Sequence, residues 1–448
     1  MHRRSLLAGT AALAAVPFAR AAHAQTNPGG ATKLVFWHAM TGPLGDQVMK
    51  IVSGFNASQS AVQVEAIYKG GYADLMTATI AAFRAGQAPN LVQIFEVGTE
   101  NMIAAGRATK EIWELVKETG VPIDPKAYIP AVRGYYSLPD GRMASMPFNS
   151  STAMMWYSKD AFQKAGLDPA KPPATWEEVT AAAETIKTKN AAEIPMNSSW
   201  FTWIMVEQYG AIHNIPFATK ENGFEGLDAV LQINSKPHVA IIERMLAMAK
   251  DGTFKYGGRD NEPDPIFLAG QSAITFNSSA YRGALLKGAK FAFAQALLPY
   301  DPTIIKQPIN SIIGGASLWP MTAPHRTAAD YKALAEFLRY IAKPEVDATW
   351  AENTGYVPVT LAGAALMQQQ GWFEKNPGTD LPIKQLTRGK VTPNSRGIRL
   401  GRLPEIRNII SEEFEKALQG GMSAQQVMDN SVERGNQVLR QFQKSVRA

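Results

Sequence analysis

The chain of 448 residues contains no cysteine. This absence excludes disulfide bonds, thiolate metal sites, a cysteine nucleophile and an N-terminal lipid-modified cysteine. An excess of charge is also lacking, because 45 Lys and Arg stand against 39 Asp and Glu. A charge this small and dispersed gives no reason to expect a nucleic-acid partner, although a mildly basic balance suits a small anionic ligand.

The common sequence motifs of enzymes are missing as well. There is no GxSxG nucleophile elbow, no HExxH zinc motif and no GxxxxGK[ST] phosphate loop. The histidines beyond residue 24 are far apart in the sequence, so no local metal pair exists and we expect them to be structural. They are His38, His213, His238 and His325. We predict no catalysis, no cofactor and no metal, although paired glycosidase carboxylates need only spatial proximity and stay open.

One acidic cluster has a spacing that resembles part of a metal-binding loop. Asp260, Glu262 and Asp264 alternate as in a calcium loop. The EF-hand pattern would require Gly at position 265 and Glu at position 271, where this chain has Pro265 and Gln271. We therefore predict a solvated loop.

The first 24 residues have the organisation of a removable export signal. His2-Arg3-Arg4 precede an apolar run over residues 6–18, and Ala22-His23-Ala24 supply small residues for cleavage. A membrane anchor would need roughly 20 uninterrupted apolar residues, and Pro17 and Arg20 interrupt this run. No other segment is long and apolar enough to span a bilayer. We expect a soluble periplasmic protein, and the paired arginines leave the export route open.

Strand-like and helix-like segments alternate after the signal. The apolar patterns predict strand, helix, strand, helix and strand over residues 34–37, 48–55, 62–66, 75–83 and 91–95. This order is typical of a mainly parallel sheet with helices on both faces. Because such sheets bind ligands at the carboxyl ends of their strands, we expect a site lined by the loops at 38–45, 69–72 and 96–98.

The length of the chain is sufficient for two cores. A region from about Tyr157 to Tyr300 is rich in helical periodicity and ends in a strand-like run, residues 272–276. The apolar residues 312–316 indicate a segment that crosses back between domains. Near the C terminus, one helical face carries Met428, Val432, Gly435, Leu439 and Phe442, so we predict a closing helix packed on the second domain. The acidic residues 412, 413 and 415 are predicted to lie on the solvent face of a helix.

Several segments together carry a resemblance to a known family. They are Phe36-Trp37-His38, Tyr68-Lys69-Gly70-Gly71-Tyr72, residues 81–86, Phe95-Glu96-Val97-Gly98-Thr99, Pro147-Phe148-Asn149-Ser150-Ser151-Thr152, residues 312–319, Thr354-Gly355-Tyr356-Val357-Pro358 and residues 399–407. In these segments the chain resembles the sn-glycerol-3-phosphate-binding proteins of bacterial ABC importers, a branch of the extracellular solute-binding family that includes the maltose-binding proteins. The match runs from about residue 34 to the C terminus.

This resemblance implies an α/β periplasmic binding protein fold, in which two lobes joined by a hinge of crossing strands close on a ligand. We expect lobe 1 to contain residues 25–148 and 306–354, and lobe 2 to contain residues 149–305 and 355–448. The implied ligands are sn-glycerol-3-phosphate and glycerophosphodiesters such as glycerophosphocholine. The implied protein partner is an inner-membrane ABC permease, and we expect a monomer.

Two other functions are open on the sequence alone. An importer protein for a neutral oligosaccharide predicts more aromatic residues in the cleft and no arginine aimed at the ligand. A secreted hydrolase of phosphodiesters predicts turnover and usually a metal.

The resemblance also implies which residues contact the ligand. Matched position by position, these contacts fall on Tyr72, Glu96, Ser151, Ser278, Gly315, Tyr356 and Arg407, with Trp200 and Trp203 as a tryptophan pair from lobe 2. A phosphomonoester prefers a fixed guanidinium with neutral donors, which Arg407, the hydroxyls and the N–H of Gly315 would supply. Glu96 would accept glycerol hydroxyls and lie away from the phosphate, because two anions repel.

Each of these positions also has a structural explanation. Arg407 follows a predicted helix start and can pair with an acid, while Ser151 can cap a helix or form a turn. Trp200 and Trp203, three residues apart, can belong to a helix core. The segment around Ser278 is bulkier than the family's run of small residues, and residues 187–199 diverge, so the register at Trp200 is a matter of judgement.

Overall fold

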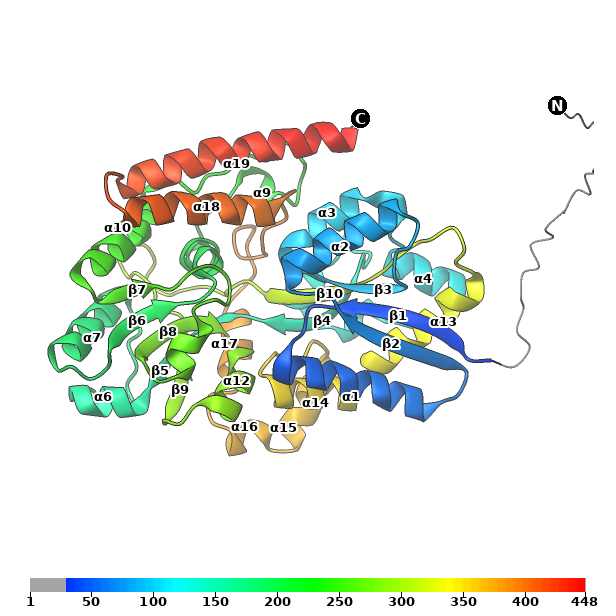
Figure 1. Cartoon of the computed structure of the whole chain (residues 1–448), viewed down its shortest axis with the longest axis horizontal. Coiled ribbons are helices and arrows are strands. Elements are labelled where there is room, and N and C mark those ends of the chain that lie inside the picture. Colours follow the sequence, from blue (N-terminus) through cyan, green and yellow to red (C-terminus); the bar gives the residue numbers. More distant parts are fainter. Residues whose placement is uncertain (1–29, 448) are drawn as a thin grey trace, which may run out of the picture.

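The computed structural model describes residues 30–447 and contains two five-stranded sheets that lie end to end (Figure 1). The predicted export signal, residues 1–24, lies outside the described residues. Within residues 30–447, no helix combines the length and the apolar character needed to cross a membrane. We call the parts built on the first and the second sheet lobe 1 and lobe 2.

The sheet of lobe 1 has the strand order β2-β1-β3-β10-β4. Its strands are β1 (Thr32–His38), β2 (Val62–Tyr68), β3 (Leu91–Phe95), β4 (Met146–Ser151) and β10 (Gly314–Pro320). The three strands predicted from the sequence are confirmed, and β1 pairs in parallel with β2 and β3. The sheet is mixed, but four of its strands run in one direction, as predicted for a mainly parallel sheet. The exception is β10, which returns from lobe 2 and runs antiparallel to both β3 and β4.

Helices cover both faces of this sheet, with α2 and α3 on one side and α1 on the other (Figure 1). Both helices predicted here are confirmed, and α1 buries Val48, Val52 and Phe55. The helices of this part are α1 (Gly42–Ser58), α2 (Tyr72–Arg84), η1 (Glu96–Gly98), α3 (Thr99–Ala104), η2 (Gly106–Ala108), α4 (Ile112–Thr119), η3 (Pro125–Ala127), α5 (Pro130–Tyr135), α13 (Ala328–Ile341) and α14 (Pro344–Thr354).

The sheet of lobe 2 has the order β7-β6-β8-β5-β9. Its strands are β5 (Ala153–Ser158), β6 (Ile194–Ser198), β7 (Phe254–Tyr256), β8 (Ser272–Ser278) and β9 (Phe293–Ala296). The strand predicted at residues 272–276 is confirmed as part of β8. This sheet is mixed as well, because β6 is parallel to β7 and β8 while β5 is antiparallel to β8 and β9.

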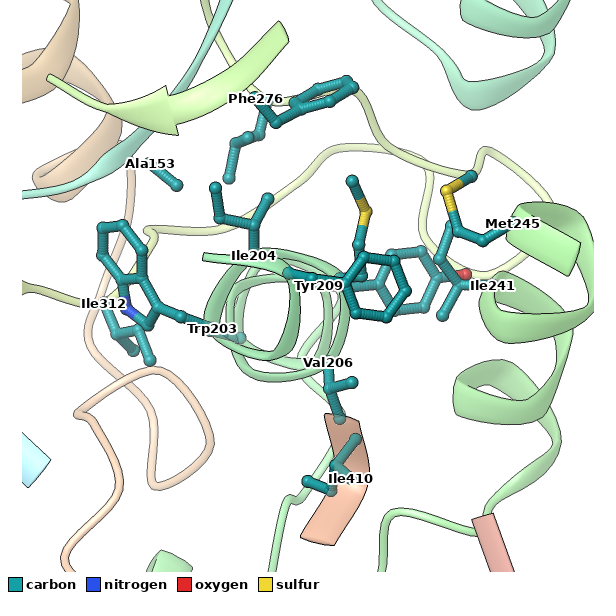
Figure 2. Close-up of a cluster of buried hydrophobic side chains, with 14 of the residues drawn as sticks. Ala153, Trp203, Ile204, Val206, Tyr209, Ile241, Met245, Phe276, Ile312 and Ile410 are labelled. Carbon is teal, nitrogen blue, oxygen red and sulfur yellow. The ribbon is translucent and has the colours of Figure 1, made fainter. Parts of the chain in front are cut away.

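The remaining helices pack on this second sheet or connect it to lobe 1. They are α6 (Lys159–Ala165), α7 (Trp176–Thr188), the π-helix η4 (Trp203–Gln208), α8 (Tyr209–Ile212), α9 (Thr219–Asn222), α10 (Lys236–Asp251), α11 (Asp264–Leu268), α12 (Tyr281–Gly288), α15 (Leu361–Gln369), α16 (Trp372–Lys375), α17 (Leu381–Leu386), α18 (Leu403–Leu418) and α19 (Ala424–Arg447). Figure 2 shows η4 surrounded by apolar side chains that include Phe276 of β8, Met245 of α10 and Ile410 of α18.

The predicted closing helix is α19, which lies beside α18 (Figure 1) and contacts α10 of lobe 2. Four of its five predicted apolar positions are buried, and Val432 is partly buried. The prediction that Glu413 faces solvent is wrong, because its side chain is only 2% exposed. It accepts a hydrogen bond from Arg434 of α19 and another from Lys416. The carboxylate is thus used to join the last two helices.

The chain crosses between the lobes at Thr152, which separates β4 from β5, and again before β10. The hydroxyl oxygens of Thr152 and Ser311 are 2.7 Å apart, so the two crossings are bonded side by side. A third segment joins them where the N–H of Val357 donates to the carbonyl of Ser150 at 2.8 Å. The fold is therefore two α/β lobes joined by crossing strands. The residue boundaries of the lobes given above stay a prediction.

Candidate functional site

A cavity of about 670 Å³ lies between the two lobes. The loops predicted to form the site contribute to its lining, with residues 39–44 after β1, 71–74 after β2 and 95–96 at the end of β3. Every candidate residue from the sequence also lines it: Tyr72, Glu96, Ser151, Trp200, Trp203, Ser278, Gly315, Tyr356 and Arg407. The fold thus brings together residues that are more than 300 positions apart.

Arg407, in the first turns of α18, is bound to two carboxylates. Its Nε donates to Glu207 Oε1 at 2.6 Å and its Nη2 donates to Glu207 Oε2 at 2.8 Å. Nη2 also donates to Glu96 Oε1 at 2.9 Å. Glu96 begins η1 in lobe 1 and Glu207 lies on η4 in lobe 2. Arg407 therefore pairs with acids, as its structural explanation predicts. It also lies in the wall of the cavity.

The charges of this triad are buried and mutually dependent. Arg407, Glu96 and Glu207 are each 7% exposed or less. Burial by itself would lower the pKa of Arg407, but the two carboxylates raise it, so the guanidinium stays charged. Burial raises the pKa of Glu96, an effect that Arg407 opposes. Glu96 was expected to lie away from a phosphate held by Arg407, yet it is bonded to the arginine that would hold it.

The wall of the cavity is acidic. Among the described residues that line it, Arg407 is the only basic one, while Asp74, Glu96, Asp260 and Asp264 are acids. A wall of this charge does not attract a simple anion at every point. It favours a ligand that presents negative charge to Arg407 and a neutral or cationic group elsewhere.

Asp260 and Glu262 are exposed, as predicted for a solvated loop, whereas Asp264 is partly buried. Its Oδ1 accepts a hydrogen bond from Ser199 Oγ at 2.5 Å and another from Asn277 Nδ2 at 2.8 Å. Burial raises the pKa of Asp264 to about 6, although both hydrogen bonds oppose the shift. The segment therefore forms part of the cavity. Residues 30–447 nonetheless bring together no group of three His, Asp or Glu side chains arranged to hold a metal ion.

A rare backbone conformation presents the lobe 2 residues. Trp200 has a φ of +51°, which is unusual for a non-glycine residue, and the π-helix η4 begins three residues later. π-helical turns are rare and are often found at functional sites. In a turn closed by i→i+5 bonds, residues four apart lie on nearly the same face, so η4 places Trp203 in the cavity wall and Glu207 against Arg407.

Trp203 lies both in the cavity wall and in the hydrophobic core. It is 4% exposed and belongs to the core, where Figure 2 shows it beside Ile312. Its ring also packs on the backbone of Gly314, where an added Cβ would lie 2.4 Å from the ring. Its buried Nε1 has no hydrogen-bond partner among the described residues.

Aromatic rings form the wall of lobe 1. Tyr72 stacks on Phe95 with ring centroids 5.3 Å apart. Its hydroxyl accepts a hydrogen bond from Asn149 Nδ2 at 2.9 Å, and Asn149 Oδ1 accepts one from Gln93 at 2.8 Å. Tyr356 is 8% exposed, and its ring stacks on that of Trp350 with centroids 5.7 Å apart. Tyr72 is thus fixed by Phe95, which also lines the cavity, and by Asn149, whereas Tyr356 is fixed by Trp350.

The small residues occupy strand ends. Ser151 is the last residue of β4, and among residues 30–447 its Oγ has no hydrogen-bond partner. Ser278 ends β8, and its Oγ already accepts from the N–H of Ala280 at 3.1 Å, which closes a turn. Gly315 has a φ of +98°, and an added Cβ would lie 1.9 Å from the carbonyl oxygen of Asn149. The close approach that requires this glycine is therefore made by the neighbouring strand.

Three residues at the site were missed by the sequence analysis. The sequence pattern predicts a solvated loop for Asp260 and Asp264, and it gives Glu207 no role. The sequence holds one signal for Glu207, since a single carboxylate that follows the apolar run Ile204-Met205-Val206 is expected to be buried and therefore paired. Nothing in the sequence indicates that its partner lies 200 positions away.

Comparisons with known proteins show the family to which the sequence is similar. Residues 50–379 match the model of the family described as bacterial extracellular solute-binding protein. The chain is 42% identical over 419 residues to the sn-glycerol-3-phosphate-binding periplasmic protein UgpB of Pectobacterium atrosepticum, with 93% of each chain covered. It is 41% identical over 440 residues to the protein of that name from Escherichia coli O1:K1, with 98% of this chain and 99% of the relative covered.

Solved structures show a similar fold. UgpB from Mycobacterium tuberculosis, in complex with glycerophosphocholine, superimposes with a TM-score of 0.76 at 20% identity, covering 93% of this chain and 100% of the other. The cyclic alpha-maltosyl-1,6-maltose binding protein from Arthrobacter globiformis gives a TM-score of 0.71 at 23% identity, covering 92% of this chain and 100% of the other. At such identities the likeness concerns the fold alone.

Proposed function

The chain belongs to the bacterial extracellular solute-binding proteins, and from this membership we propose that it is the periplasmic binding component of an ABC importer for sn-glycerol-3-phosphate and glycerophosphodiesters such as glycerophosphocholine. It binds and delivers its ligand without chemistry. The observation that carries the proposal is the convergence of nine matched positions on one interlobe cavity that contains a buried, fixed arginine. A neutral oligosaccharide would offer the guanidinium no charged partner beyond Glu96 and Glu207.

The proposed role of Arg407 is to bind the phosphate. Two of its nitrogens are occupied by Glu207 and Glu96, while Nη1 has no acceptor among residues 30–447. A charge-assisted hydrogen bond from a guanidinium to phosphate is about twice as strong as a neutral one. Ser151 Oγ and the backbone N–H of Gly315 are neutral donors that are proposed to complete the cradle, together with Trp203 Nε1.

The glycerol and the remainder of a diester are proposed to occupy the other parts of the cavity. Tyr72 and Tyr356 offer apolar faces with hydroxyls, and Glu96 keeps one oxygen, Oε2, for a glycerol hydroxyl. A volume of about 670 Å³ is within the range typical of sites for drug-sized ligands, so it leaves room beyond glycerol-3-phosphate. Asp260 and Asp264 face that room, and their carboxylates suit a cationic head group such as choline.

Ligand capture is proposed to close the two lobes. Ligands shift such an equilibrium by binding one state better than the other. The closed protein would then be recognised by an inner-membrane ABC permease, and the binding protein is proposed to act as a monomer. Lobe 1 is proposed to comprise residues 25–148 and 306–354, and lobe 2 the remainder of the exported chain.

Isothermal titration calorimetry of the protein without its export signal tests this proposal. The titrants are glycerol-3-phosphate, glycerophosphocholine and maltose, and the variants are Arg407→Ala and a matched control, Arg434→Ala. Arg434 is also ion-paired but lies on α19, outside the cavity. We expect glycerophosphate binding that is lost in Arg407→Ala and kept in Arg434→Ala. Binding of maltose alone would refute the ligand assignment.

A further inference from the structure

The hydrogen-bond inventory of Arg407 assigns a role to Glu207. A guanidinium has five N–H groups. Nε–H and one N–H of Nη2 donate to the two oxygens of Glu207, and the second N–H of Nη2 donates to Glu96. Both hydrogens of Nη1 stay without an acceptor among residues 30–447. The guanidinium is therefore bonded along the edge formed by Nε and Nη2, whereas Nη1 has no partner among these residues.

We propose that Glu207 is a positioning residue for ligand binding, which holds the Nε and Nη2 edge of Arg407 so that Nη1 faces the cavity. This role rests on the proposed function of the cavity as a phosphate site. Glu207 itself does not line the cavity, so it acts through Arg407 and does not touch the ligand. Its bidentate geometry is the one that suits a guanidinium, whose donors form a rigid fork.

The π-helix explains why Glu207 can hold the arginine so firmly. Glu207 is 3% exposed, and the next residue, Gln208, is completely buried. Gln208 Nε2 donates to the carbonyl of Ile312 at 2.9 Å, and its Oε1 accepts from the N–H of Ile312 at 3.2 Å. Ile312 lies in the segment that crosses between the lobes. One turn of η4 thus fixes both the ligand-facing arginine and the hinge, which gives Glu207 a rigid base.

Electrostatics alone predict the opposite effect for Glu207. A carboxylate beside Arg407 repels an incoming phosphate, so neutralising it would strengthen anion binding if only charge mattered. If Glu207 orients the guanidinium, neutralising Glu207 weakens ligand binding. The hydrogen bonds to Arg407 become weaker, so Nη1 is no longer held in the orientation that faces the ligand. The sign of the change in affinity therefore separates the two roles.

The variants are Glu207→Gln, Arg407→Lys, the double variant and Glu413→Gln. Glutamine keeps the shape and one acceptor of glutamate. Lysine carries a positive charge but lacks the planar set of N–H donors of a guanidinium, so its affinity for the ligand depends little on being held in one orientation. Glu413, 2% exposed and paired with Arg434 outside the cavity, is the matched buried glutamate. Calorimetry with glycerol-3-phosphate gives the affinities, and thermal unfolding gives the folded fraction. NMR of the arginine Nε–H groups reports whether the hydrogen bond from Arg407 to Glu207 is kept in the protein without ligand.

We expect Glu207→Gln to weaken binding about tenfold or more and to broaden the Nε signal of Arg407. In the Arg407→Lys background the same substitution should cost much less, because coupled residues give non-additive effects. Glu413→Gln should lower the melting temperature without changing affinity. Unchanged or tighter binding by folded Glu207→Gln would overturn the positioning role. Failure of the parent protein to bind any glycerophosphate would instead overturn the proposed function, and this role with it.

Discussion

Replacing Gly315 by alanine tests how closely the two central strands of lobe 1 determine the cavity. A φ of +98° is disfavoured for an L-residue by about 1–2 kcal/mol. The new Cβ would also lie 1.9 Å from the carbonyl oxygen of Asn149, which is a backbone atom and cannot rotate away. β10 must then move from β4 and lose ladder hydrogen bonds. We expect a total cost of about 4 kcal/mol or more, at the upper end for a single substitution.

Gly420→Ala is the matched control for this variant. Gly420 has a φ of +99°, and nothing lies within 4 Å of its added Cβ. It therefore reports the backbone cost alone. For a protein of this size, each kcal/mol lowers the melting temperature by about 1–2 °C. Differential scanning calorimetry should show a small decrease for Gly420→Ala and a decrease at least twice as large for Gly315→Ala, together with weakened ligand binding. Equal melting temperatures and full affinity in Gly315→Ala would refute the reasoning.

Three further substitutions address the charges and donors of the cavity. Arg407→Ala leaves Glu96 and Glu207 buried without their partner and should cost roughly 3–5 kcal/mol of stability; adding Glu207→Gln should recover part of the loss in thermal unfolding, and no recovery would contradict the triad. The pKa of Asp264 is raised to about 6 in the folded protein, so its contribution to stability is present below about pH 4 and is lost as pH rises toward 6. Asp264→Asn should therefore gain up to about 3 kcal/mol relative to the parent between pH 4 and 7 in urea unfolding, and parallel pH profiles would count against a buried, shifted carboxyl. Trp203→Phe removes a buried N–H that has no described partner, so glycerophosphate affinity should fall by about 0.5–1.5 kcal/mol in calorimetry; unchanged affinity would show that this N–H does not donate to the ligand. The melting temperature should also fall, because Trp203 belongs to the core and the smaller ring leaves a void.

The local elements could be predicted because their apolar patterns are strong. The strand at residues 91–95 and the C-terminal helix face depend on neighbours in sequence, where periodicity is informative. The place of β10 depends on pairing with strands more than 150 positions away, and no local pattern contains that information. For this reason the sequence predicts the parallel strands of the first sheet but not the antiparallel strand β10 between them.

The candidate site shows the same division. The family resemblance placed all nine residues on one cavity, because matched positions follow the fold. It did not give the bonds among them, since Arg407 and Glu207 are brought together only by the packing of α18 on η4. The sequence predicts a solvated loop for Asp264 because its spacing fails as a calcium motif, whereas its partial burial depends on Ser199 and Asn277, which come from other parts of the chain.

The insertion of β10 into the middle of the first sheet also sets an order for folding during synthesis and export. Until residue 320 is available, β3 has one open edge and β4 has no partner in the sheet. The strands of the second sheet, in contrast, all lie between residues 153 and 296 and can pair as soon as that stretch has emerged. The part of the chain that is made first is thus completed last. Open edges invite pairing with other chains, so the nascent N-terminal half is where a chaperone would be most needed.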